Sequence, residues 1–121
     1  MSTTTTKLIG KPFVTKAEIP RQRIVDMFIG ACEGGSNYWC KELDPFADKG
    51  DPYETMLDGF TLTDGESGKK HRITKQMISD AVRDFAQKEP RHFADMLSES
   101  DDATTADVFL QLCVFGEVIY G

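Results

Sequence analysis

Two short stretches carry side chains suited to ligand binding, and the first is the sequence GGSNYWC at residues 34–40. Glycines let a ligand or another backbone approach closely, and tyrosine or tryptophan rings offer faces on which bases can stack. The candidate binding residues here are Gly34, Gly35, Asn37, Tyr38 and Trp39. Because a helical pattern precedes the glycines, the stretch lacks the strand–loop–helix order of a phosphate-binding fingerprint. The alternative interpretation is a helix stop followed by a core strand with Trp39 buried.

The second stretch is the basic run Lys69-Lys70-His71-Arg72, which stands out in an acidic chain. Strand alternation places Lys70 and Arg72 on one face and His71 on the other, with Ile73 toward the core. A pair of outward cations would attract anions or an acidic partner surface. Arg21 and Arg23, at the start of the first predicted helix, are further candidates for phosphate contacts. The alternative is an ordinary solvated strand face.

Catalytic and metal chemistry has weaker support in the sequence. Cys32 and Cys40 lie eight residues apart with no second pair at zinc-ligand spacing, so we predict neither a metal site nor a cofactor. A nucleophile pair of Cys40 and His71 would require the fold to bring them together, and no local signature supports it. A Cys/His-dependent enzyme is therefore only a weak alternative, and no catalytic residue is predicted.

Length, composition and charge favour one compact domain with an acidic surface. The chain has 121 residues, which suits a single domain, and residues 1–11 have the composition of a flexible tail. The net charge of −6 argues against nucleic-acid binding. We find no apolar run long enough for a membrane span and no apolar core of a signal peptide, so we expect a cytoplasmic protein. An odd number of cysteines then suggests free thiols, with Cys113 in the core.

The hydrophobic pattern predicts an α+β fold built around a buried C-terminal helix. Residues 103–115 are apolar on nearly every side, as in a helix buried on nearly every side. Gly116 suits a left-handed helix stop, and Gly30 suggests close packing against another backbone. The other predicted elements are helices at 20–33, 75–89 and 91–98, a hairpin of 59–63 with 69–73, a strand at 36–41, a loop at 42–58, and a short strand or tail at 118–120.

Gln111 is the only polar residue between Val108 and Phe115. A buried side-chain amide must find hydrogen-bond partners. It could hold a neighbouring backbone segment, or it could reach a ligand or a second subunit. We include it among the candidate binding residues. Apolar surface at Phe115 and Tyr120 could also seal a symmetric homo-oligomer.

Two sequence blocks resemble a group of small phage and prophage proteins. The matching residues are Gly34, Gly35, Tyr38, Trp39 and Cys40, then Asp102, Ala103, Ala106, Asp107, Val108, Gln111, Phe115, Gly116, Glu117, Tyr120 and Gly121. The resemblance implies a phage origin and no particular reaction. It also implies an accessory role, because small phage proteins of this kind often act against host defences in the infected bacterium.

Two binding functions follow as hypotheses. In the first, a counter-defence protein sequesters a small anionic, nucleotide-derived immune signal without catalysis. Tyr38 or Trp39 would stack on the base while the basic side chains meet the phosphates and Asn37 orients the ligand. In the second, the protein inhibits a host defence complex, in the manner of an anti-CRISPR protein, through acidic residues in 42–58 and 98–102. The first hypothesis requires the helix at 103–115 to hold the glycine corner and the basic hairpin close together.

Overall fold

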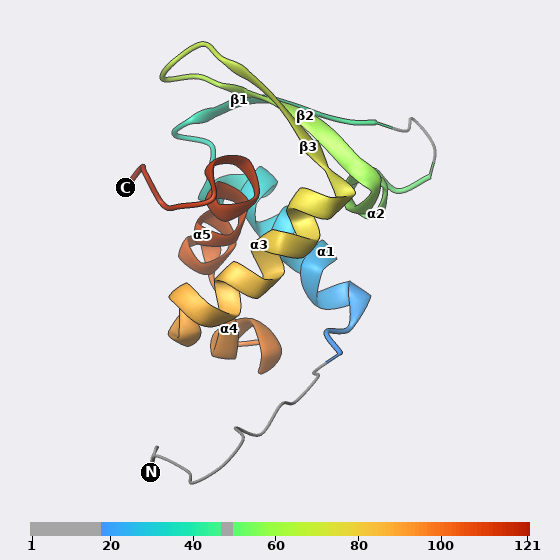
Figure 1. Cartoon of the computed structure of the whole chain (residues 1–121), viewed down its shortest axis with the longest axis vertical. Helices are drawn as coiled ribbons and strands as arrows, with labels where there is room; N and C mark the ends of the chain where they lie inside the picture. Colours follow the sequence, from blue (N-terminus) through green and yellow to red (C-terminus); the bar gives the residue numbers. More distant parts are fainter. Residues whose placement is uncertain (1–17, 47–49) are drawn as a thin grey trace, which may run out of the picture.

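The computed structural model describes residues 18–46 and 50–121; the tail predicted at residues 1–11 lies outside this part of the chain. Within it, five α-helices and two short helical turns accompany a three-stranded antiparallel sheet, which confirms the predicted α+β class. The elements are α1 (Arg21–Gly30), η1 (Ala31–Gly35), β1 (Cys40–Pro45), α2 (Pro52–Thr55), η2 (Met56–Asp58), β2 (Gly59–Asp64), β3 (Lys70–Thr74), α3 (Lys75–Lys88), α4 (Pro90–Leu97) and α5 (Ala103–Phe115). Figure 1 shows the sheet across the top with the helices packed below it, on one of its faces.

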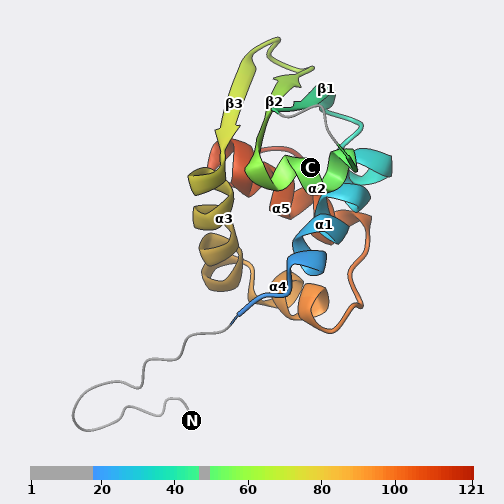
Figure 2. The same cartoon turned by 90° about the vertical axis from the view of Figure 1, so that its right-hand side faces the viewer.

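Helix α5 is the centre of the molecule, as its sequence predicts. Residues 105–114 are all buried, and α5 packs against α1, η1, α3 and α4. Figure 2 shows it between α1 and α3. The Asp102 carboxylate accepts a hydrogen bond from the Thr105 amide and caps the helix, and Gly116 ends it in the left-handed conformation with φ 74°. The helix thus has an N-cap, an αL stop and an apolar surface, all of which favour it locally.

Close packing between α1 and α5 explains Gly30. A Cβ built on Gly30 would lie 2.8 Å from the Cβ of Ala106, so the two helices approach at a point where only a glycine fits. This confirms the close contact expected from Gly30. On the other side, α3 begins as predicted at Thr74, whose hydroxyl accepts a hydrogen bond from the Met77 amide.

The sheet has the order β1-β2-β3, and β2 with β3 forms the predicted hairpin. Leu62 of β2 lies opposite Leu43 of β1 and His71 of β3. This row faces the helices, since Leu62 is buried and the His71 ring packs edge-on against Phe115 of α5. The neighbouring rows point to the other face, which is open to solvent.

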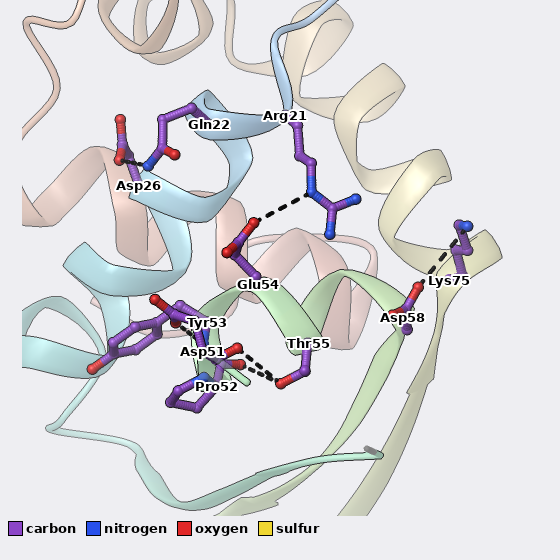
Figure 3. Close-up of polar contacts among 10 residues, drawn as sticks. All are labelled: Arg21, Gln22, Asp26, Asp51, Pro52, Tyr53, Glu54, Thr55, Asp58 and Lys75. Atoms are coloured by element: carbon purple, nitrogen blue, oxygen red, sulfur yellow. Dashed lines mark hydrogen bonds and ion pairs between the residues drawn. The ribbon is translucent and has the colours of Figure 1, made fainter. Parts of the chain in front are cut away.

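Two predictions about local structure are wrong. Residues 36–39 form a turn, so the strand expected at 36–41 begins at Cys40 and runs to Pro45. The loop expected at 42–58 contains this strand together with α2 and η2. Pairing with β2 orders the strand, while Asp51 caps α2 by accepting a hydrogen bond from the Tyr53 amide at 2.8 Å (Figure 3). Of the strand or tail expected at 118–120, the structure has the tail, because these residues pair with no strand.

No helix in the described ranges, 18–46 and 50–121, has the length and apolar character that crossing a bilayer requires.

Candidate functional site

The glycine corner is a tight junction between η1 and the first turn of α5. A Cβ on Gly35 would collide with the carbonyl oxygen of Ala103, whereas a Cβ on Gly34 would meet no atom within 4 Å. Gly35 is therefore needed for the fold, because the two backbones touch there. Gly34 faces open space and leaves the corner accessible from outside.

The Asp107 side chain is the hub of the corner. Its Oδ1 accepts hydrogen bonds from Ser36 Oγ at 2.8 Å and Trp39 Nε1 at 2.7 Å. Its Oδ2 accepts from Tyr38 Oη at 2.6 Å and Gln111 Nε2 at 3.1 Å. Asp107 is 7% exposed. Two donors on each oxygen suit an ionised carboxylate, which only accepts hydrogen bonds, and the group joins α5 to the turn at residues 36–39.

The Gln111 amide holds the C-terminal tail, residues 116–121. Its Oε1 accepts hydrogen bonds from the Ile119 and Tyr120 amides at 2.8 and 2.9 Å, and its Nε2 donates to the Tyr120 carbonyl at 3.1 Å. The side chain is fully buried. This confirms that a neighbouring backbone satisfies Gln111, and it corrects the expectation of a direct ligand contact because no surface of the amide is left for one.

The hairpin turn joins the same network. Tyr120 Oη donates to Asp64 Oδ2 at 2.6 Å, and the Gly65 amide donates to the Trp39 carbonyl at 2.6 Å. Burial raises the pKa of Asp64, but hydrogen bonds from Tyr120, Glu66 and Ser67 outweigh it and leave the pKa lowered. The bond to Asp64 is the main reason that the pKa of Tyr120 rises to about 12. Corner, tail and hairpin turn therefore form one hydrogen-bonded unit.

Trp39 is a core residue, which corrects its assignment as a stacking face. It is 1% exposed, and its ring packs against Phe115 and Tyr120 with centroid distances of 5.3 and 5.7 Å. Tyr38 is different, because 51% of it is exposed. Burial of its hydroxyl and the hydrogen bond to Asp107 raise its pKa to about 12. The Tyr38 ring thus remains accessible while its hydroxyl is held by the network.

The backbone of the hairpin runs close to the corner, but the side chains of its basic residues point away from the corner. Lys70 and Arg72 are exposed, as predicted. They pair with Thr63 and Thr61 on the outer face of the sheet. The Arg72 guanidinium lies 4.3 Å from the centroid of the Phe46 ring. The corner network lies on the opposite face of the sheet, so these cations do not share a site with Tyr38.

Arg21 and Arg23 are engaged in ion pairs at the start of α1. Arg21 Nε lies 3.7 Å from a carboxylate oxygen of Glu54 in α2, a contact visible in Figure 3. Arg23 bonds Asp26 and Glu99, each at 2.8 Å, and the hydrogen bond to Glu99 is the main cause of its raised pKa. The four expected phosphate ligands therefore do not meet at one site, because Lys70 and Arg72 lie on the outer face of the sheet and Arg21 and Arg23 lie on α1.

The accessible part of the corner is a hollow of about 390 Å³, here called the corner hollow. It lies between the corner, the first turns of α5 and the C-terminal tail. Its lining includes Gly34, Gly35, Tyr38, Thr104, Asp107, Val118, Tyr120 and Gly121. Three of the predicted site residues thus surround one cavity, and none of the predicted cations does.

Comparisons with protein-family models, curated proteins and solved structures find no match for this chain. Its function must therefore be argued from the geometry of its own residues.

A second hollow, of about 320 Å³, lies on the other side of the corner. Cys32, Asn37, Cys40, Lys41 and Tyr53 are among the residues that line it. Asn37 is therefore separated from the cavity that Tyr38 lines. Burial raises the pKa of Cys32 to about 12 and that of Cys40 to about 11. Both thiols are therefore protonated at neutral pH, and a protonated thiol is a poor nucleophile.

Sequence reasoning missed the role of Asp107, which it named only among the residues that carry the resemblance to phage proteins. One signal was available: Asp107 lies four residues before Gln111, on the same face of an apolar helix. Two polar side chains on a buried face must satisfy each other or a shared partner. That pairing points to a buried network at the corner, although it does not identify Ser36, Tyr38 or Trp39 as the donors.

Proposed function

We propose that this chain is a non-catalytic binding protein that engages a partner protein through the surface around the corner hollow. One observation carries the proposal. Tyr38 and Val118, which are 51% and 41% exposed, come from distant parts of the chain and both line the corner hollow. Exposed apolar side chains beside a cavity are typical of interaction surfaces, and tyrosine is enriched at the centres of interfaces.

The charges around the corner hollow favour a protein over a nucleotide-derived anion. Asp107 lines the hollow, while Lys70, Arg72, Arg21 and Arg23 do not. Among the described residues that line the hollow, a phosphate would meet a carboxylate and no basic side chain. The nucleotide-derived ligand is the second candidate, favoured by the open ring face of Tyr38.

The acidic stretch at 42–58 is less suited to bind the partner than the sequence suggested. Asp51 caps α2, and Glu54 and Asp58 form ion pairs with Arg21 and Lys75 (Figure 3). At 98–102, Glu99 pairs with Arg23 and Asp102 caps α5. These carboxylates already have partners within the chain, whereas Glu42 and Asp44 are exposed on the outer face of the sheet, away from the hollow. We therefore place the interaction surface at the corner hollow.

The host-directed role rests on the resemblance to small phage proteins. Several of the residues that carry the resemblance line the corner hollow, among them Gly34, Tyr38, Tyr120 and Gly121. The partner would then be a bacterial defence protein. An enzymatic role has little support, because the thiol of Cys40 has a raised pKa and the ring of His71 packs against Phe115.

The test compares three surfaces of the tagged protein expressed in a defence-proficient bacterial host. Val118→Asp alters the corner hollow, Lys70→Glu with Arg72→Glu alters the outer sheet face, and Leu97→Asp alters a third exposed apolar side chain as the matched control. We expect one host protein to co-purify in stoichiometric amount with the wild type, the sheet variant and the control. Val118→Asp should weaken its retention about tenfold, as for an interface residue worth more than about 1 kcal/mol.

Native mass spectrometry of the same samples separates the two candidates. A retained nucleotide that disappears in Val118→Asp but not in the sheet variant, with no protein partner, would establish the second candidate. Retention of the host protein by Val118→Asp at wild-type level would contradict the proposed surface. Circular dichroism of each variant checks that the exposed substitutions leave the fold intact.

A further inference from the structure

We infer that the partner inserts a basic side chain, an arginine or a lysine, into the corner hollow; this inference rests on the proposed function. The charge of the surrounding segments is one-sided. Residues 33–38, 101–108 and 116–121 contain five acidic side chains and no lysine or arginine: Glu33, Asp101, Asp102, Asp107 and Glu117. Of these five, only Asp107 lines the hollow itself. Lys88 donates a hydrogen bond to the Gly116 carbonyl of the tail, so the attraction of a cation into the hollow rests mainly on Asp107.

Asp107 supplies the strongest part of that attraction. Its four hydrogen-bond donors are neutral groups, and it takes part in none of the ion pairs found in the part of the chain that the structure describes. The carboxylate charge is thus solvated by dipoles but not neutralised. Because the group is 7% exposed, it is screened less by water than a surface carboxylate.

The N-terminus of α5 does not reverse the negative electrostatic potential of the hollow. A helix N-terminus carries a partial positive charge, and Ala103 and Thr104 of this turn line the cavity. However, the Asp102 carboxylate accepts hydrogen bonds from the Thr105 amide and hydroxyl at 2.9 and 3.2 Å. A full negative charge therefore caps the turn and outweighs its dipole.

The side chains that line the hollow could also contact the charged group and the methylene stem of a long basic side chain. The exposed Tyr38 ring offers a π-face to a guanidinium or ammonium group. Val118 and Val108 offer apolar contact to its methylene stem. A volume of about 390 Å³ can hold one such side chain but is small for a folded element. Charge, aromatic face and size together favour a single arginine or lysine anchor.

The inference can be tested by NMR without knowing the partner. The protein has one tryptophan, and its indole N–H donates to Asp107, so its resonance reports on the floor of the hollow. The probes are the capped tripeptides acetyl-Gly-Arg-Gly-amide and its citrulline analogue, which has nearly the same shape but no charge. We expect saturable shifts of the Trp39 indole and Thr104 amide signals with the arginine peptide, at about millimolar Kd, and none with the citrulline peptide.

Variant Thr104→Lys places a resident cation at the hollow and should abolish the arginine response, whereas Leu97→Lys adds the same charge elsewhere and should preserve it. Equal responses to the two peptides, including none, would overturn the inference. The pull-down separates this failure from that of the proposed function. If Val118→Asp loses the host protein while Thr104→Lys retains it, the basic anchor is wrong and the function stands. If both variants retain it, the proposed function fails.

Discussion

The corner network and the outer face of the sheet are both unusual in the sequence, yet they differ in what their polar groups do. At the corner, Asp107 and Gln111 are buried and bond to groups of the same chain. On the sheet, Lys70 and Arg72 point to solvent, and acids occupy the opposite edge strand at Glu42 and Asp44. The polar groups of the corner hold its segments together, whereas the charged side chains of the outer sheet face are exposed to solvent.

This difference shows why residue type alone is a poor guide to a binding site. Tyr38 and Trp39 are adjacent and both donate to Asp107, but one ring is half exposed and the other is in the core. A ligand can reach only the part of the corner that the hydrogen-bond network leaves exposed. Substitutions in the two regions should therefore have very different costs.

The largest effect is expected for Asp107→Asn. The amide keeps the shape of the carboxylate but replaces one acceptor oxygen by a donor, so two buried donors lose their partner at a cost of about 2–4 kcal/mol in unfolding free energy. Asp44→Asn, an exposed substitution on the sheet, should change stability by less than about 0.5 kcal/mol. Urea titration followed by Trp39 fluorescence measures both. Equal stabilities would mean that the network does not hold the corner.

The helices and their ends could be predicted from the sequence because their causes are local. Residues 103–115 carry their own cap, apolar surface and glycine stop, and Thr74 marks the start of α3. The strand at 40–45 could not be predicted, since its order comes from pairing with residues about twenty positions away. Composition around its Asp-Pro step instead favoured a loop.

The site was predictable in part for the same reason. The sequence identified the glycine corner, Tyr38 and the buried amide of Gln111. It did not show that Trp39 bonds a carboxylate 68 positions later. Nor could it show that the corner would lie on the face of the sheet opposite to Lys70 and Arg72. Contacts between distant segments decide both points.

The two adjacent glycines of the corner provide a matched pair for the next test. Gly35→Ala places a methyl group against the Ala103 carbonyl and should destabilise the protein by about 1–3 kcal/mol through overpacking. Gly34→Ala meets open space and should change stability by less than about 0.5 kcal/mol. Thermal and urea unfolding measure the difference. Equal costs would show that the corner is not the tight junction described above.

A smaller, pH-dependent effect is expected at Asp102. Hydrogen bonds from the Thr105 backbone and other donors lower its pKa from the usual value near 4. The folded state thus favours the ionised form, so its contribution is present above about pH 4 and is lost as pH falls through the lowered pKa.

Asp102→Ala should therefore lower the unfolding free energy by about 1 kcal/mol at neutral pH, as for other lost N-caps. The difference in unfolding free energy from wild type should become smaller in acid. Thr74→Ala removes a cap that carries no titratable group, so its difference in unfolding free energy from wild type should not change with pH. Urea titrations from pH 7 to pH 3, a range of about four units that spans the usual carboxyl pKa, follow both variants. A constant difference for Asp102→Ala would mean that its charge adds nothing to the cap.

The smallest effect is expected on the outer sheet face, at Arg72→Gln. Its guanidinium lies over an exposed phenylalanine ring, and such a contact is worth about 0.5–1 kcal/mol at an exposed site. The loss should shrink in high salt, because the attraction is electrostatic and solvent-exposed. Phe46→Leu removes the same contact together with the packing of the ring on Gly59, so the double variant should cost less than the sum of the two single ones. Additive costs would mean that the ring and the guanidinium act separately. The contact between them would then add little to the stability of the sheet face.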